Sequence, residues 1–226
     1  MKKTTVYLIR HSVRFNSNNI IQYNSKQSNI KKSEKSILSV EGEKRSEILS
    51  NEKELQNIDV VYASNCVRTL QTAKYLLEKQ NLNVNIDERL DEKRVGKPND
   101  DVVKDWWQRQ YEDENYKTEG GESQKEVRER VAEVVNEILD ANKGKRIAIF
   151  SHGYAITFYL MTWCKFLYNG RKDDVQFYYK NKKIFDKKIN APEVFKLEFD
   201  ENNEVIDIKN LEFDDLPYRD GLGEWL

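Results

Sequence analysis

The sequence predicts an α/β fold: a three-layer α/β/α sandwich around a mostly parallel mixed sheet, closed by a C-terminal β-hairpin. Strand-like apolar runs alternate with helical patterns through most of the chain, which favours parallel strands joined by right-handed crossovers. Two later runs alternate apolar and polar residues on either side of a turn, as a hairpin does. The 226 residues are enough for one sizeable core, so we expect a single domain over residues 1–226.

The composition argues against several classes of partner. The 38 Lys and Arg residues nearly cancel the 39 Asp and Glu residues, and a net charge of −1 provides no electrostatic footprint for nucleic acid or an anionic membrane. No apolar run reaches the ~20 residues needed to cross a bilayer. The N-terminus lacks the features of a signal peptide. Cys66 and Cys164 match no metal-ligand spacing, so we expect two reduced thiols in a cytoplasmic protein.

The first predicted strand covers residues 4–11 and ends in Arg10-His11, because its run of Val, Tyr, Leu and Ile contains no Gly or Pro. A polar stretch, residues 12–37, follows without lasting periodicity. We interpret it as a loop insertion that is either simply solvated or gates substrate. Ser39 should cap a helix that runs to about Leu49. The second strand, residues 58–63, has adjacent apolar side chains, as expected when both faces are covered.

The middle of the chain continues the alternation. Apolar residues at three- and four-residue spacings predict a helix over residues 66–80, which Asn81 ends. A short third strand at 84–86 leads into an acidic loop, and residues 101–111 are expected to be helical. We expect Trp106 and Trp107 to pack in the core rather than line a pocket.

Ser123 and Glu126 form the pattern of a capping box, which should start a helix that runs to about Asn142. Helix capping accounts fully for the run Gly121-Glu122-Ser123, so we assign it no catalytic role. The fourth strand, residues 146–150, ends at Ser151-His152-Gly153. The helix expected over 154–167 is apolar around most of its surface and should be buried.

Residues 168–190 interleave basic and aromatic side chains, a composition that can bind nucleic acid. Because the chain as a whole is not basic, we favour a second polar loop insertion. The runs 193–199 and 204–211 predict the closing hairpin. The tail after Asp214 should be peripheral.

The chain contains only two histidines, His11 and His152, and each follows a strand-like run. In an open parallel sheet the carboxyl ends of the strands form the crevice where ligands bind. The same edge should receive Arg10, Arg68 and Glu92. This inventory suits phosphoryl transfer: guanidinium groups bind phosphate oxygens, an imidazole can attack phosphorus, and an acid can protonate the leaving oxygen.

Six short motifs occur between about residues 5 and 160 in the order that is typical of one protein family. They are Leu8-Ile9-Arg10-His11, Leu38-Ser39-Val40-Glu41-Gly42, the run from Tyr62 to Ala73, Leu90-Asp91-Glu92 with Gly96, Gly121-Glu122-Ser123, and Ser151-His152-Gly153. In these motifs the chain resembles the histidine phosphatase superfamily, the phosphoglycerate-mutase-like proteins.

The resemblance implies that His11 is the nucleophile, that Arg10, Arg68 and His152 bind the phosphoryl group, and that Glu92 is the proton donor. It implies a phosphatase that needs neither metal nor cofactor and acts on a small phosphorylated substrate, with a phosphoprotein as a second option. We expect hydrolysis of phosphomonoesters through a covalent phosphohistidine on His11.

Some residues depart from the family pattern. Ser12 replaces the usual Gly, and its hydroxyl could donate to phosphate. Arg14 stands where many members have Thr or Ser, and is either a third phosphate-binding cation or a surface residue. Lys97-Pro98-Asn99 replaces the usual continuation after Gly96.

The phosphoglycerate mutase signature around the acid is absent, so a phosphatase is preferred over a mutase-type phosphoryl transfer. A non-catalytic phospholigand-binding protein on the same fold is the third hypothesis.

Overall fold

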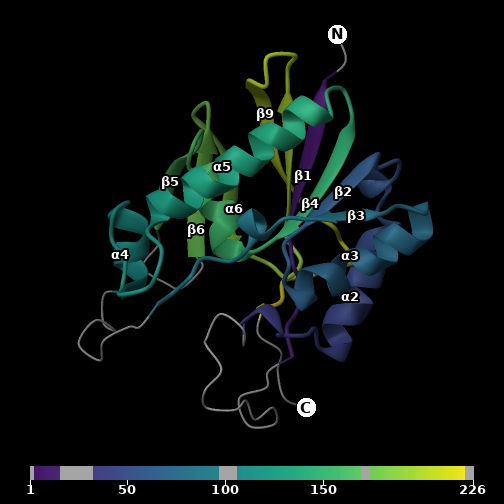
Figure 1. Cartoon of the computed structure of the whole chain (residues 1–226), viewed down its shortest axis with the longest axis horizontal. Helices are drawn as coiled ribbons and strands as arrows, with labels where there is room; N and C mark the ends of the chain where they lie inside the picture. The colour runs from purple at the N-terminus through teal and green to yellow at the C-terminus, as the bar shows by residue number, and fades with distance from the viewer. Residues whose placement is uncertain (1–2, 16–32, 97–105, 169–173, 222–226) are drawn as a thin grey trace.

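The computed structural model describes residues 3–15, 33–96, 106–168 and 174–221. Its centre is a six-stranded sheet in the order β3-β2-β4-β1-β8-β9 (Figure 1). The strands β3, β2, β4 and β1 run parallel to one another, β8 is antiparallel to β1, and β9 is antiparallel to β8. This confirms the predicted mostly parallel sheet with its closing hairpin. The strands are β1 (Thr4–Arg10), β2 (Val60–Ala63), β3 (Val84–Ile86), β4 (Arg146–Ser151), β8 (Val194–Phe199) and β9 (Val205–Leu211).

Helices cover both faces of this sheet, which gives the three predicted layers (Figure 1). On β1, Val6 and Leu8 belong to one apolar cluster and Tyr7 and Ile9 to another, and all four are at most 2% exposed. A strand buried on both faces is what a central parallel position requires. The first cluster includes side chains of α5 (Gln124–Ala141) and α6 (Gly153–Leu160), and the second includes those of α2 (Val40–Asn51) and α3 (Val67–Gln80).

The predicted helix ends agree with the structure wherever the signal was a local cap. The Ser39 hydroxyl accepts from the Gly42 N–H at 3.0 Å and starts α2. Asn81 adopts a left-handed conformation, with φ of 52°, and ends α3. Ser123 and Glu126 make both hydrogen bonds of a capping box at the start of α5. The remaining helical elements are α4 (Trp106–Glu112) and the short 3-10 turns Lys53–Leu55 and Glu88–Leu90.

The expectation of a polar loop insertion over residues 168–190 is wrong. Three antiparallel strands form a second sheet there, in the order β5-β6-β7. Alternate side chains of β6, namely Val175, Phe177 and Tyr179, are buried against the main core, and the intervening polar residues concealed this period in the sequence. The helix expected to reach residue 167 ends at Leu160, because residues 165–168 pair with β6 as a strand. The strands are β5 (Lys165–Tyr168), β6 (Asp174–Tyr179) and β7 (Lys182–Lys188).

The C-terminal segment is not peripheral, contrary to expectation. Leu216 is buried in the core, and the Arg45 guanidinium donates to the Pro217 carbonyl oxygen at 2.7 Å. The carbonyl oxygen of Gly221 accepts from the Arg14 N–H at 2.9 Å. The end of the described chain therefore lies against the segment that follows β1.

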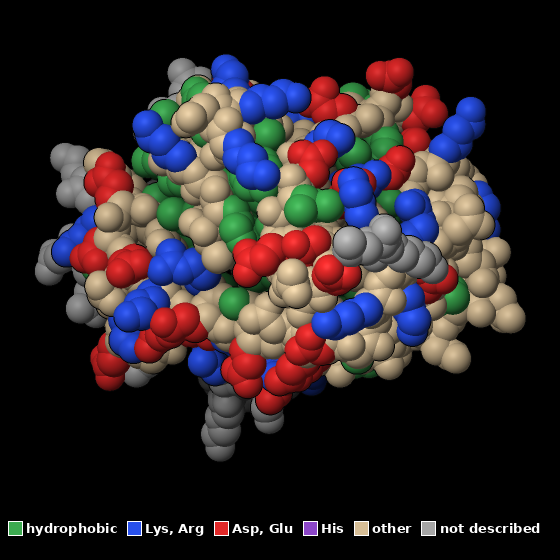
Figure 2. Space-filling view, turned by 90° about the horizontal axis from the view of Figure 1, so that it is seen from above, with side chains coloured by type: hydrophobic (Ala, Val, Ile, Leu, Met, Phe, Trp, Pro, Cys, Tyr) green, Lys and Arg blue, Asp and Glu red, His purple; other side chains and the backbone are tan. Residues whose placement is uncertain are grey.

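Three expectations lie outside the described residues: the conformation and gating role of residues 16–32, the packing of the Trp106 and Trp107 side chains, and the segment Lys97-Pro98-Asn99. Within the described ranges, no helix is both long and apolar enough to span a membrane. On the face drawn in Figure 2, basic and acidic side chains are interspersed, in keeping with the near-zero net charge.

If β6 is part of the core rather than a solvated insert, Phe177→Ala should destabilise the protein by about 3–5 kcal/mol. Phe177 is fully buried and contacts the rings of Phe166, Phe185 and Phe195. Chemical denaturation measures the free energy of unfolding. Leu167→Ala on β5, where the side chain is 41% exposed, is the matched control and should change it by about 0.5 kcal/mol or less. Equal effects of the two substitutions would contradict this assignment.

Candidate active site

The two histidines meet at the carboxyl edge of the sheet. Strands β1 and β4 are parallel neighbours in which Arg10 pairs with Ser151, and the His11 N–H donates to the Ser151 carbonyl oxygen at 3.0 Å. The next residues, His11 and His152, therefore stand side by side. Their ring centroids are 5.3 Å apart at an interplanar angle of 62°, and both side chains are buried.

The tautomer of His11 follows from its hydrogen bond. Its Nδ1 lies 2.7 Å from the Ser12 carbonyl oxygen, which can only accept, so Nδ1 carries the proton. The lone pair of the neutral ring is therefore on Nε2. Burial, followed by the charges of Arg68, Arg10 and Arg14, holds the pKa of His11 well below its ordinary value. The imidazole is thus kept neutral, the form that can act as a nucleophile.

His152 is held in the opposite tautomer. The Arg68 Nη2 donates to its Nδ1 at 2.9 Å, so the proton of the neutral ring is on Nε2, which donates to the Ser64 hydroxyl at 2.7 Å. Burial and then the Arg68 charge hold the pKa of His152 well below its ordinary value. Ser64 was not predicted as a site residue, although it follows β2 directly within one of the matching motifs.

Three guanidinium groups surround these rings. Arg68 is 1% exposed, and its Nη1 donates to the Ser33 carbonyl oxygen at 2.6 Å. Arg10 donates through Nη1 to two backbone carbonyl oxygens, of Ile189 at 2.7 Å and Asn190 at 3.1 Å. Within the described parts of the chain, neither these arginines nor Arg14 forms an ion pair with a carboxylate.

Three buried donors at this site have no hydrogen-bond partner among the described residues. They are the Nε groups of Arg10 and Arg68 and the hydroxyl of Ser12. Leaving such groups unsatisfied costs free energy, and an oxyanion would satisfy all three. The site is therefore suited to a multivalent anion.

Arg14 belongs to the same cationic group and is not an isolated surface residue. Burial, followed by the charges of Arg68 and Arg10, lowers its pKa to about 10. The charges of Glu92 and Asp220 act on this pKa in the opposite direction. Sequence reasoning left two roles open for Arg14, a third phosphate-binding cation or a surface residue, and the structure places its half-buried side chain near the other arginines.

Glu92 approaches the site from the loop after β3. Its Oε1 accepts from the backbone N–H of Lys93 at 2.9 Å and from that of Ala155, in the first turn of α6, at 3.3 Å. Because α6 begins directly after His152, this contact brings the carboxylate to the same edge as both imidazoles. Arg10, His11, Arg14, Arg68, Glu92 and His152 are thus gathered at one end of the sheet.

The loop after His11 is held by residues that sequence reasoning did not single out. The Ser12 N–H donates to the Thr72 hydroxyl at 3.0 Å, and that hydroxyl donates to the Arg68 carbonyl oxygen at 2.7 Å. A side chain at Gly42 would place its Cβ 2.1 Å from the Val13 carbonyl oxygen, so only glycine lets α2 pack here. Both residues lie in matching motifs, which was the only available signal.

One group of possible metal ligands lies beside the site: Cys66, Asp91 and His152 offer atoms within 4.8 Å of one another. Their chemistry does not suit a cation. Both ring nitrogens of His152 are engaged, one of them with the Arg68 guanidinium, which would repel a divalent ion. Burial raises the pKa of the Cys66 thiol to about 11, which keeps it protonated. We therefore assign this group no metal.

The two histidines should make the ligand-free protein sensitive to acid. Because their folded-state pKa values lie well below 6.5, the unfolded chain binds protons below that pH that the folded protein does not. The free energy of unfolding should fall as the pH drops from about 7 to about 5, by at most ~1.4 kcal/mol per pH unit for each histidine. Denaturant titrations in phosphate-free buffer measure it. His152→Gln should reduce this dependence, and an undiminished slope in that variant would contradict the assignment.

Comparison with known proteins agrees with this geometry. The sequence profile of the histidine phosphatase superfamily (branch 1) matches residues 6–174. A search of curated proteins finds no significant match. Among solved structures, a mycobacterial glucosyl-3-phosphoglycerate phosphatase complexed with VO3 has a TM-score of 0.64 at 17% identity, covering 94% of this chain and 99% of that one.

Two further solved structures have the same fold. Bacillus stearothermophilus YhfR has a TM-score of 0.61 at 20% identity, covering 90% of this chain and 94% of its own. A mutant phosphoserine phosphatase from Entamoeba histolytica in complex with phosphoserine has a TM-score of 0.60 at 17% identity, covering 91% and 96%. With three quarters of its length matched by the family profile and its fold shared with these structures, the chain belongs to the histidine phosphatase superfamily.

Proposed function

We propose that this protein is a phosphatase that hydrolyses phosphomonoesters through a covalent phosphohistidine on His11, without a metal ion. The observation that carries the proposal is the state of His11. Its ring is neutral and its Nε2 lone pair is not needed for the hydrogen bond to Ser12. Three guanidinium groups surround it, and among the described residues none of them forms an ion pair with a carboxylate. A neutral nucleophile beside a cluster of guanidinium groups is what covalent phosphoryl transfer requires.

In the first half-reaction, the arginines bind the dianionic phosphoryl group and Nε2 of His11 attacks phosphorus. The N–P bond forms as the bond from phosphorus to the ester oxygen breaks. Glu92 donates its proton to that oxygen, which leaves as an alcohol. Arg10, Arg68 and His152 bind the equatorial oxygens, where charge is spread in the transition state. The Nε2–H of His152 reaches a phosphoryl oxygen by giving up its bond to Ser64.

In the second half-reaction, the ionised Glu92 accepts a proton from water as the water oxygen attacks phosphorus. The N–P bond breaks, inorganic phosphate leaves, and His11 returns to its neutral form with Nδ1 protonated. Glu92 regains the proton that it donated in the first step, so the cycle is balanced.

Two structural neighbours are phosphatases named for small phosphorylated compounds, phosphoserine and glucosyl-3-phosphoglycerate. We extend this to a small phosphorylated substrate here, with a phosphoprotein as the second option. Cys66 and Cys164 are both free and buried, which supports a reducing compartment such as the cytoplasm.

His11→Ala should abolish hydrolysis of an aryl phosphate in the presence of a chelator, because it removes the attacking nitrogen. In the unmodified protein, a radiolabelled phosphate ester should transfer its phosphoryl group to protein in an acid-labile, base-stable form. Unchanged turnover in the variant would refute the proposal. Efficient phosphoglycerate interconversion without release of inorganic phosphate would instead favour a mutase, and stable phosphate binding without labelling would favour a non-catalytic phospholigand-binding protein.

Arg14→Met should weaken inhibition by vanadate about ten- to hundredfold and raise KM, since it removes one half-buried cation from the anion site and a hydrogen bond to a charged group is worth about 1.5–3 kcal/mol. Arg128→Met is the matched control because Arg128 pairs with Glu114 on the surface of α5. Equal vanadate affinity in the two variants would place Arg14 outside the phosphate site.

A further inference from the structure

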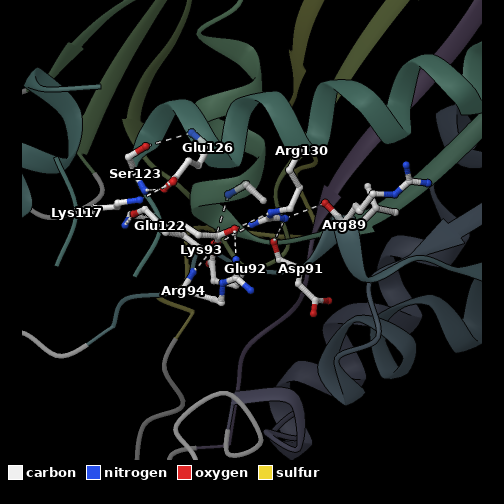
Figure 3. Close-up of polar contacts among 12 residues, drawn as sticks. Arg89, Asp91, Glu92, Lys93, Arg94, Lys117, Glu122, Ser123, Glu126 and Arg130 are labelled. Atoms are coloured by element: carbon white, nitrogen blue, oxygen red, sulfur yellow. Dashed lines mark hydrogen bonds and ion pairs between the residues drawn. The ribbon is translucent and has the colours of Figure 1, made fainter. Parts of the chain in front are cut away.

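The loop that carries Glu92 is held by a cluster of polar side chains that the proposed reaction does not use (Figure 3). Arg130 projects from α5 toward this loop. Its Nη1 donates to the Arg89 carbonyl oxygen at 2.8 Å and to the Asp91 carbonyl oxygen at 3.0 Å. These two carbonyl groups lie on the N-terminal side of Glu92, so a single guanidinium fixes the backbone just before the proposed acid.

Glu122 fixes the backbone on the other side. Its carboxylate is 6% exposed and forms a bidentate ion pair with Arg130, with distances of 2.9 Å to Nε and 3.0 Å to Nη2. The same carboxylate accepts from the backbone N–H of Arg94 at 2.8 Å. The segment from Arg89 to Arg94 is therefore tied at both ends to one ion pair.

The segment around Glu122 lies directly against this loop. The Lys93 ammonium donates to the Glu122 carbonyl oxygen, and the Glu122 N–H donates to the Arg94 carbonyl oxygen at 2.8 Å. A side chain on Gly121 would place its Cβ 2.8 Å from the Val95 carbonyl oxygen. Glycine is thus required for the two segments to approach this closely.

Helix capping does not account for Glu122, contrary to the expectation from the sequence. The capping box is formed by Ser123 and Glu126, and it is complete without the preceding residue. Glu122 and Arg130 make their contacts with the Glu92 loop rather than with the helix N-terminus. The motif Gly121-Glu122-Ser123 therefore combines a cap with a second, separate contact.

The outcome of these contacts is a defined orientation of the Glu92 carboxyl group. Its Oε1 accepts two backbone N–H groups, from Lys93 and Ala155, whereas Oε2 has no hydrogen bond within the described part of the chain. An oxygen that already accepts two donors is the less basic one, so the proton belongs on Oε2. Only one of the two oxygens is thus presented as the acid.

We propose that Glu122 and Arg130 are positioning residues for proton transfer: their ion pair holds the Glu92 loop so that Oε2 faces the leaving group. This inference rests on the proposed phosphatase function. It predicts a loss confined to the step in which Glu92 donates its proton, because the arginines and His11 are held by other contacts.

The dependence on leaving group isolates that step. A phosphate ester of an acidic alcohol, such as dinitrophenyl phosphate, leaves without a proton, whereas phenyl phosphate needs one. Since general acid catalysis is worth about 10²–10⁴-fold, we expect Glu122→Gln to lower kcat/KM for phenyl phosphate about tenfold or more, with a much smaller change for dinitrophenyl phosphate. Arg130→Lys keeps the charge but has no guanidinium to bind the Glu122 carboxylate through two nitrogens and both carbonyl oxygens through the third. It should act in the same direction if Glu122→Gln does not fold.

Two controls separate positioning from general stability. Ser123→Ala removes the helix cap, at a cost of about 1 kcal/mol, and should leave the leaving-group dependence unchanged. Combining Glu122→Gln with Glu92→Gln should add no further leaving-group effect to that of Glu92→Gln alone. Equal losses on both esters in folded Glu122→Gln or Arg130→Lys would overturn the positioning role. Absence of the effect in Glu92→Gln itself would overturn the role of Glu92 in the proposed function, and this inference with it.

Discussion

The site depends on three arginine side chains, Arg10, Arg14 and Arg68, that lie together at the carboxyl edge of the sheet and form no ion pair with any carboxylate that the structure describes. Placing unpaired charges in the interior is costly, and each must be supported by other polar groups. Arg68 is supported by the Ser33 carbonyl oxygen and His152, and Arg10 by two carbonyl oxygens just before β8. These contacts orient the guanidinium groups without neutralising them, so the positive charge remains available to a ligand.

Burial and the same positive charge together keep both imidazoles neutral. Burial and the neighbouring guanidinium groups hold the pKa values of His11 and His152 well below the ordinary range. A neutral ring has one donor and one acceptor nitrogen, and the Ser12 carbonyl oxygen and the Arg68 guanidinium select opposite tautomers. His11 therefore has its lone pair on Nε2, which suits it to attack phosphorus. His152 has its proton on Nε2, which suits it to donate a hydrogen bond to a phosphoryl oxygen.

The features of the fold and of the site that could be predicted from the sequence are those marked by a pattern of neighbouring residues. The strands, the caps at Ser39 and Ser123, and the placement of both histidines at one edge of the sheet follow from short-range patterns and one topological rule. The second sheet was missed because lysines and other polar residues on its outward positions outweighed the buried alternation of Val175 and Phe177. The contact of Gly221 with Arg14, and that of Glu122 with the Glu92 loop, join segments far apart in the chain, and no local pattern records such pairs.

These features together explain why one carboxyl group would need such a firm support. With His11 already deprotonated at Nε2, the nucleophile requires no base, and the arginines have no proton to offer at working pH. Proton movement in both half-reactions would then fall to Glu92 alone, since it must give a proton to the leaving oxygen and recover one from water. A group with two opposite tasks at nearly the same place tolerates little displacement. A loop residue is ordinarily free to move. The Glu122–Arg130 pair restricts the motion of Glu92 through hydrogen bonds to the backbone on both sides of it.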